Sequence, residues 1–181
     1  MLALALATVL TAAGFFASRV LEKRTYALHY PDEIRLYADE YGLNRYLVAA
    51  VIHCESGNRP AVRSPKGAVG LMQIMPATGA WIAEKLELKG FHEDMLLDPA
   101  VNIRFGCWYL SYLNVRYDDE KKVLAAYNAG PGNVEKWLGD AKYSEEGQLV
   151  SIPFPETSNY VERVKRAGQK YEELYERELK K

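Results

Sequence analysis

The clearest hydrophobic pattern in the chain is an unbroken apolar run at residues 47–52, which is followed closely by Glu55. A helix that is apolar on every side belongs in a core rather than at a surface. Asn44 is suited to cap the start of this helix, and Gly57 is suited to end it. A carboxyl group at the end of a core helix is desolvated, and desolvation raises its pKa. Glu55 is therefore the first candidate for an acid that keeps its proton near neutral pH.

Apolar residues at helical spacing predict further helices along the rest of the chain. The predicted helices cover residues 31–41, 45–56, 76–86, 100–117, 120–128 and 133–138, and a last one begins near 156. Clusters of Pro and Gly mark the loops between them. Alternating strand patterns of any length are missing, and residues 69–74 and 149–152 are the best short β candidates. The pattern predicts a mainly α fold with long loops and at most a very small β element.

The beginning of the chain differs from the rest, because residues 1–17 carry no charge and are rich in Leu and Ala. Such a stretch, followed at once by charged residues, predicts a membrane anchor or a signal segment over residues 1–20. Either interpretation places the remainder outside the cytoplasm. We expect a spacer at 21–30, one folded domain at 31–176 and a charged tail at 177–181.

Composition narrows the classes of function. The formal net charge of −1 gives no electrostatic basis for binding nucleic acid. Two cysteines and three scattered histidines form neither a disulfide framework nor a metal-ligand pattern, so no metal and no cofactor is expected. Cys54 and Cys107 are expected to be buried free thiols, and a disulfide between them in an oxidising compartment is the alternative. We expect a monomer.

Several polar residues lie at odds with apolar or turn-forming surroundings, and each has a structural explanation as well as a functional one. Ser56 follows Glu55 and can bond to helix carbonyls, while Gln73 stands alone in an apolar run and can bond to loop backbone. The others are Tyr127 and Asn128, which precede a Gly-Pro-Gly turn, and Glu156 and Tyr160, one turn apart on a helix.

Taken together, most of these residues fall in three motifs, and Glu156 and Tyr160 belong to a fourth match near the end of the chain, at 156–164. The motifs are Glu-Ser at 55–56, Ser-Pro-Lys-Gly-Ala-Val-Gly-Leu-Met-Gln-Ile-Met-Pro at 64–76, and Ala-Tyr-Asn-Ala-Gly-Pro-Gly at 126–132. The chain resembles the lytic transglycosylases of the soluble (SLT) type over residues 30–171. This resemblance implies a fold like that of goose-type lysozyme. It also implies cleavage of peptidoglycan between N-acetylmuramic acid and N-acetylglucosamine.

The resemblance also implies roles for individual residues. Glu55 corresponds to the catalytic acid and base of the family. The positions implied to bind the glycan are Ser56, Ser64, Gly70, Met72, Gln73, Met75, Tyr127, Asn128, Glu156 and Tyr160. The chain departs from the family at Asn58 and Arg59, because the aromatic residue usual after the Glu-Ser pair is missing.

Only one catalytic carboxylate is evident, whereas most glycosidases use two. A single Glu55 suffices if the C6 hydroxyl of the muramic sugar acts as nucleophile, which gives a 1,6-anhydro end. The alternatives are a hydrolytic lysozyme in which Glu156 activates water, and a non-catalytic glycan-binding protein on the same fold.

Overall fold

The structure is a computed structural model that describes residues 2–180, with side chains from residue 14 onward. Its elements are α1 (Leu2–Thr25), α2 (Pro31–Glu40), α3 (Arg45–Ser56), α4 (Pro76–Lys85), the 3₁₀ helix η1 (Glu93–Leu97), α5 (Pro99–Arg116), α6 (Glu120–Ala129), α7 (Pro131–Leu138), β1 (Ser144–Glu145), β2 (Gln148–Leu149) and α8 (Pro155–Leu179). The predicted mainly α fold is confirmed, and the boundaries of most helices lie within two residues of the expected ones.

The β structure of the described part is very small, as the sequence predicts. Strands β1 and β2 form one antiparallel hairpin, in which Ser144 pairs with Leu149. Two isolated bridges join Val69 to Arg63 and to Ile74. The first of the two β candidates is therefore a pair of bridges in a turn. Of the second candidate, at 149–152, only Leu149 lies in a strand, because β2 covers Gln148–Leu149.

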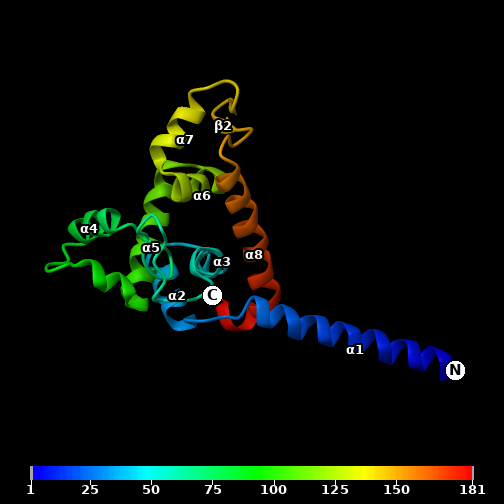
Figure 1. Cartoon of the computed structure of the whole chain (residues 1–181). Helices are drawn as coiled ribbons and strands as arrows, with labels where there is room; N and C mark the ends of the chain where they lie inside the picture. The colour runs from blue at the N-terminus through cyan, green and yellow to red at the C-terminus, as the bar shows by residue number, and fades with distance from the viewer. Residues whose placement is uncertain (1, 181) are drawn as a thin grey trace.

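Helix α3 lies at the centre of the domain and packs mainly against α8 and α2 (Figure 1). The Asn44 side chain caps it by accepting bonds from the N–H groups of Tyr46 and Leu47, at 2.8 and 3.3 Å. Five successive residues, 48–52, are each at most 2% exposed, so the helix is buried all round as its apolar run predicts. Gly57 ends it with a left-handed φ of 59°.

Helix α8 covers α3 with one apolar face. Its buried residues recur at steps of three and four, which places them in a single stripe. The helix continues to Leu179, which is 1% exposed, and the Arg45 guanidinium donates to the Leu179 carbonyl at 3.2 Å. The described end of the chain, through Lys180, is thus in contact with the domain, where a charged tail is expected from residue 177.

The expected spacer at 21–30 is also part of the folded structure, because α1 extends into it and the following residues pack on α8. Glu22 forms an ion pair with Lys170 at 3.1 Å. The Leu28 N–H donates to the Tyr175 hydroxyl at 3.2 Å. The segment therefore joins α1 to the domain through defined contacts rather than as a free linker.

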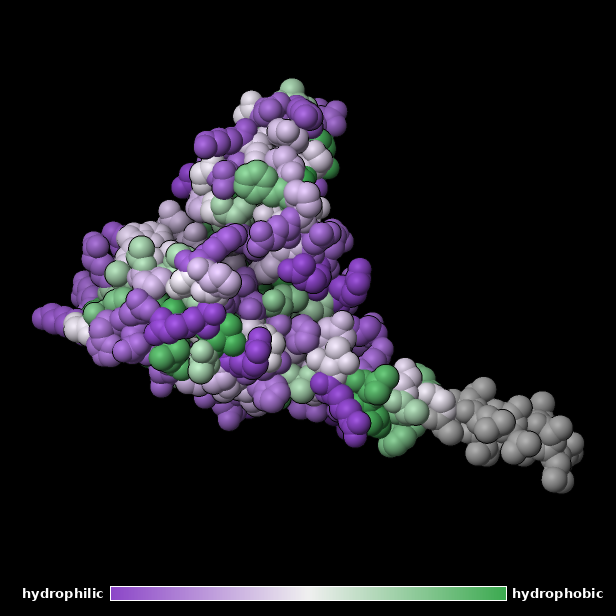
Figure 2. Space-filling model, in the orientation of Figure 1, coloured by the Kyte–Doolittle hydropathy of each residue, from purple (hydrophilic) through white to green (hydrophobic). Residues whose placement is uncertain are grey.

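Helix α1 projects away from the other helices (Figure 1). Within the residues described, no helix is both long and apolar enough to cross a membrane. The anchor or signal segment expected at 1–20 falls largely on residues 1–13, whose side chains lie outside the described part. In the described part of α1, Phe15, Phe16 and Leu21 are 69%, 71% and 66% exposed. Figure 2 shows apolar side chains where α1 leaves the domain.

Candidate active site

The loop between α3 and α4 forms one wall beside Glu55, and its shape is set by short-range backbone bonds. The Ser64 hydroxyl accepts the Ala68 N–H at 3.0 Å, and the Ser64 N–H donates to the Ala68 carbonyl at 2.9 Å. Val69 and Ile74 exchange two backbone bonds of 3.0 Å each. Ser64 thus closes the turn that carries the Lys-Gly pair of the motif.

Gln73 sits at the tip of the second turn, with a left-handed φ of 50°. Its side-chain amide donates to the carbonyls of Val62 and Gly70, at 3.2 and 2.8 Å. These bonds are the structural explanation that its position in an apolar run suggests. They also fix the orientation of the Gln73 side chain within the wall.

Asn102 of α5 holds this loop from behind. Its side-chain amide is fully buried and donates to the carbonyls of Val69 and Leu96, at 2.9 and 2.7 Å, while its oxygen accepts the Met72 N–H at 2.7 Å. A Cβ at Gly70 would lie 2.2 Å from the Asn102 amide nitrogen, so only glycine fits beside it. Buried backbone groups need such partners, since unpaired ones are costly.

Glu55 lies at the end of α3, half-buried against the loop and α8. Desolvation raises the pKa of its carboxyl group from 4.5 to about 7. The Tyr160 hydroxyl and the charge of Arg163 act in the opposite direction, and the charge of Glu156 adds to the increase. Both the protonated and the ionised forms of Glu55 are therefore accessible near neutral pH, and the direction of the pKa shift is the one that the apolar run before Glu55 predicts.

Two tyrosines flank the Glu55 carboxyl. The Tyr127 hydroxyl donates to the Met72 carbonyl at 2.8 Å, which ties α6 to the loop. Tyr160 is 2% exposed, and its hydroxyl faces Glu55 without a well-aligned hydrogen bond to any described residue. Burial, and then the charge of Glu55, raise the pKa of both tyrosines well above the ordinary value. Both phenols therefore remain neutral donors.

A second wall combines the end of α6 with the start of α8. The Thr157 hydroxyl donates to the Asn128 side-chain oxygen at 2.8 Å. Glu156, with a side chain 73% exposed, lies 3.7 Å from the ammonium of Lys66 on the opposite loop. Such an exposed ion pair contributes little stability, but it shows that the two walls approach each other.

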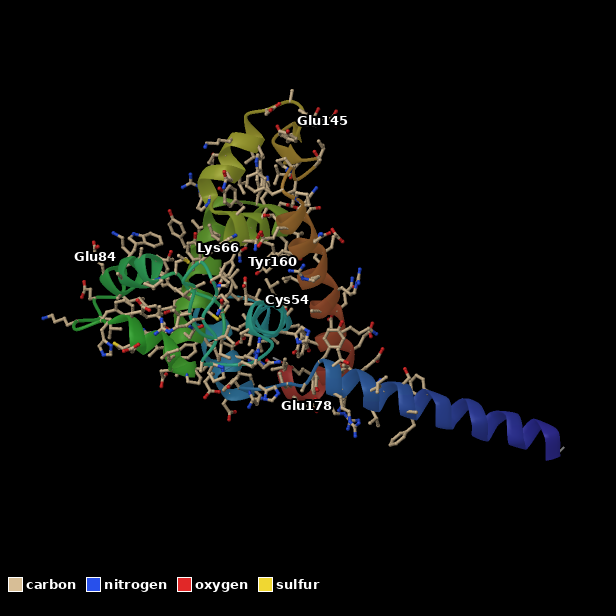
Figure 3. The ribbon with its side chains drawn as sticks, in the orientation of Figure 1. Cys54, Lys66, Glu84, Glu145, Tyr160 and Glu178 are labelled. Carbon is tan, nitrogen blue, oxygen red and sulfur yellow. The ribbon has the colours of Figure 1, made fainter. Side chains whose placement is uncertain are left out.

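The views agree with this arrangement. Figure 2 shows the surface indented between the lobe that carries α4 and the lobe that carries α7, with hydrophilic side chains along the indentation. Figure 3 labels Lys66, Tyr160 and Cys54, which come from the loop, α8 and α3 and lie around the middle of the domain.

Three of the residues expected to bind glycan lie behind the walls instead. Ser56 is 1% exposed, and its hydroxyl donates to the Ile52 carbonyl of its own helix at 3.0 Å. Met72 is fully buried against Gly106, where a Cβ would lie 2.2 Å from the Met72 sulfur. Gly70 is buried against α5. The buried Met72 side chain and the close contact at Gly70 fix the loop against α5, and Ser56 bonds within its own helix.

The other expected residues lie where a ligand has access to them or next to Glu55. Met75 is 42% exposed at the start of α4, Glu156 is exposed, and Asn128 is half-buried. Our sequence reasoning gave no role to three residues that the structure places in or behind the site: Lys66, Asn102 and Arg163. Arg163 follows Tyr160 by one helical turn, with its guanidinium 6.0 Å from the Tyr160 ring centroid, and that spacing was the available signal.

Cys54 and Cys107 are both unpaired, as expected. Burial raises the pKa of the Cys54 thiol to about 11, and it raises that of Cys107 further. Because the thiolate is the reactive form, neither cysteine is suited to act as a nucleophile near neutral pH.

The raised pKa of Glu55 predicts an alkaline limit to activity if Glu55 acts as a general acid. The acid is protonated below pH 7 and ionised above it, so the rate should fall up to tenfold per pH unit as pH rises beyond about 7. Contact with the Tyr160 hydroxyl lowers this pKa, so Tyr160→Phe should move the limit to higher pH. Initial rates on purified peptidoglycan across pH 5–9 would test both; a limit at the ordinary glutamate pKa would contradict the assignment.

A helical domain that holds a desolvated, partly protonated glutamate between two walls is typical of the lysozyme-like class of proteins. The chain belongs to the transglycosylase SLT domain family, whose model matches residues 32–150. It is 38% identical over 148 residues to "Soluble lytic murein transglycosylase" of Escherichia coli K12. The aligned region covers 80% of this chain and 23% of that protein. It is 27% identical over 170 residues to "Membrane-bound lytic murein transglycosylase C" of Glaesserella parasuis. That alignment covers 80% of this chain and 46% of the relative.

Solved structures agree. The crystal structure of the 70 kDa soluble lytic transglycosylase of Escherichia coli superposes with a TM-score of 0.75 at 34% identity, covering 84% of this chain and 25% of that one. An inactive glutamate-to-glutamine mutant of the lytic transglycosylase Slt of Pseudomonas aeruginosa gives 0.73 at 32%, covering 82% and 24%. The chain thus spans about a quarter of the length of the soluble relatives and 46% of the membrane-bound one.

Proposed function

We propose that this protein cleaves the β-1,4 bond between N-acetylmuramic acid and N-acetylglucosamine in peptidoglycan without using water, leaving a 1,6-anhydro end. The observation that carries the proposal is the position of Glu55, at the end of a core helix with a pKa raised to about 7. Membership of the SLT family and the names of the relatives support the same substrate.

In the proposed reaction, Glu55 acts first as acid and then as base. Its carboxyl proton passes to the glycosidic oxygen as the bond from C1 breaks, which releases the N-acetylglucosamine side as an alcohol. The C6 hydroxyl of the muramic sugar then bonds to C1, and its proton passes to the Glu55 carboxylate. The acid is regenerated and no water is consumed. A pKa near the working pH suits a group that serves in both steps.

The side chains around Glu55 support these two roles. Tyr127 and Tyr160 stay protonated, so their hydroxyl groups do not compete with Glu55 for the catalytic proton. Gln73 and Asn128 hold side-chain amides on the two walls, which is the kind of group that fixes the orientation of a polar ligand.

Hydrolysis is the second candidate, with Glu156 activating water. Glu156 is 73% exposed and lies beside Lys66, so the structure gives it no desolvated environment like that of Glu55. This difference between the two carboxyl groups favours the reaction that needs only one.

The mass of the products separates the two reactions. Purified peptidoglycan is digested with the protein, and the soluble muropeptides are analysed by mass spectrometry without chemical reduction. We expect muramic ends that are lighter by one water than a reducing end. Reducing ends as the main product would support hydrolysis, and no soluble product would support a non-catalytic binding protein.

We also propose that the protein acts outside the cytoplasm and is held at a membrane by its N-terminal segment. The uncharged stretch 1–17, the exposed Phe15 and Phe16, and a relative named as membrane-bound support this location. Fractionation of cells after high-salt washing would test it, since release by salt alone would argue against attachment through α1.

A further inference from the structure

Four aromatic side chains on α4 and α5 form a cluster that the candidate active site does not use. They are Trp81, Trp108, Tyr109 and Tyr112, and we call them the aromatic platform. The core-facing residues of α5 are different ones, namely Asn102, Ile103, Phe105, Gly106, Cys107, Leu110 and Leu113. Trp108, Tyr109 and Tyr112 lie outside this buried set, and Trp108 and Tyr109, like Trp81 of α4, pack against the edge of the core. Tyr112 is 36% exposed, and the other three are half-buried.

The rings of the platform have an ordered arrangement. The planes of Trp108 and Tyr109 are within 6° and 9° of the plane of Tyr112. Trp81 stands nearly perpendicular to all three, at centroid distances of 5.0 to 6.3 Å. Three nearly parallel rings at i, i+1 and i+4 on one helix thus share one orientation.

The platform is continuous with the candidate active site. The ring centroid of Tyr109 lies 5.5 Å from that of Tyr127, whose hydroxyl bonds the Met72 carbonyl in the wall beside Glu55. From Tyr127 the series continues to Tyr109 and then to Tyr112 in centroid steps of 5.5 and 6.3 Å.

Packing between α4 and α5 explains only part of this cluster. Trp81 of α4 packs edge-on against Trp108, Tyr109 and Tyr112 of α5, whereas Tyr112 remains exposed at the end of the series. Tyr and Trp rings combine an apolar face with a polar N–H or O–H at the edge. A pyranose ring has the same combination, with an apolar C–H face and hydroxyl groups at its rim.

We propose that the aromatic platform is a binding surface for sugar rings of the glycan strand that lie beyond those held next to Glu55. This inference rests on the proposed function, because it takes the strand to leave the active site past Tyr127. The continuity with Tyr127 favours a glycan over a protein partner as the occupant.

The test measures binding with turnover removed. Glu55→Gln protein is titrated with peptide-free glycan strands from peptidoglycan, and tryptophan fluorescence is recorded, since two of the three tryptophans lie in the platform. Adding Tyr112→Ala should weaken binding by about five- to tenfold, the effect of losing one ring contact. Tyr112→Phe keeps the ring and should bind within about twofold of the parent. Trp108→Leu serves as a second ring deletion that retains an apolar side chain against α4.

Tyr46→Ala is the matched control, because Tyr46 is a half-buried ring on α3 beside a groove lined by Gln169 and Glu172 of α8. It should leave glycan affinity unchanged. Unchanged affinity in both Tyr112→Ala and Trp108→Leu would overturn the proposal, as would self-association that these variants abolish while glycan affinity stays the same.

Wild-type digestion of peptidoglycan is measured separately. Normal digestion with unchanged affinities refutes only the platform, whereas absent digestion with the expected affinity losses refutes only the reaction.

Discussion

Replacing Glu55 with glutamine is expected to lower peptidoglycan turnover by about a thousandfold, the typical contribution of a general acid and base. Glutamine has nearly the same shape, but its amide can neither supply the proton to the leaving oxygen nor accept one from the C6 hydroxyl. Release of soluble muropeptides from purified sacculi at pH 6 would measure the loss. Release of anhydro products at the wild-type rate would rule out Glu55 as the acid.

The stability of the same variant distinguishes lost chemistry from lost folding. The folded-state pKa of Glu55 is raised above its ordinary value of 4.5, so ionisation destabilises the folded protein as pH rises from about 4.5 to 7. Glu55→Gln removes that penalty. The variant should therefore unfold at higher urea than wild type at pH 8, by a free energy on the order of 2 kcal/mol, with the gap narrowing toward pH 4. Lower stability of the variant at both pH values would attribute its inactivity to misfolding.

Replacing Asn102 with alanine is expected to be the most damaging change outside the walls themselves. The variant leaves the Met72 N–H and the carbonyls of Val69 and Leu96 without their buried partner. Leaving such groups unsatisfied should cost about 2–4 kcal/mol of unfolding free energy. Urea denaturation followed by circular dichroism would measure it, and activity should fall because the loop wall loses its support.

Asn114→Ala provides the comparison, because Asn114 is on the same helix but exposed. Its unfolding free energy should stay within about 0.5 kcal/mol of wild type. If Asn102→Ala were no less stable than Asn114→Ala, the three hydrogen bonds to the loop would not hold it in place.

The fold and the central acid could be predicted from the sequence because each depends on a local pattern. An apolar run of about one and a half turns has no solvated face, so residues 48–52 had to be buried wherever the helix lay. Glu55 follows the same helix, and its desolvation comes with that burial. The helix boundaries were marked by Asn44 and Gly57, whose roles are set within a few residues.

The orientation of the side chains in the loop between α3 and α4 could not be predicted in this way. Which side chains of residues 69–74 point outward depends on the bridge between Val69 and Ile74 and on Asn102, which is distant in sequence. Met72 is buried and Met75 exposed for that reason, although both lie in one motif.

The contacts at the two ends of the domain depend on residues that are distant in sequence. Glu22 of α1 and Lys170 of α8 form an ion pair, so these charged residues join the segment at 21–30 to the domain. Leu179 was the overlooked signal near the C-terminus, because its apolar side chain is buried among charged neighbours.

The attachment of α1 has a consequence for direction. Tyr26, just after α1, packs against His53 of α3 with ring centroids 5.0 Å apart, and the Tyr171 hydroxyl bonds the Ala27 carbonyl. Helix α1 and the domain are therefore expected to move as one body, and α1 is about 36 Å long at 1.5 Å per residue. Inserting one residue near Gly14 would rotate the part of α1 before the insertion by about 100° around the helix axis, relative to the domain. The same insertion would lengthen the helix by only about 1.5 Å. An attachment at the first turns of α1 would therefore fix the direction in which Glu55 faces more strictly than the distance between Glu55 and the point of attachment.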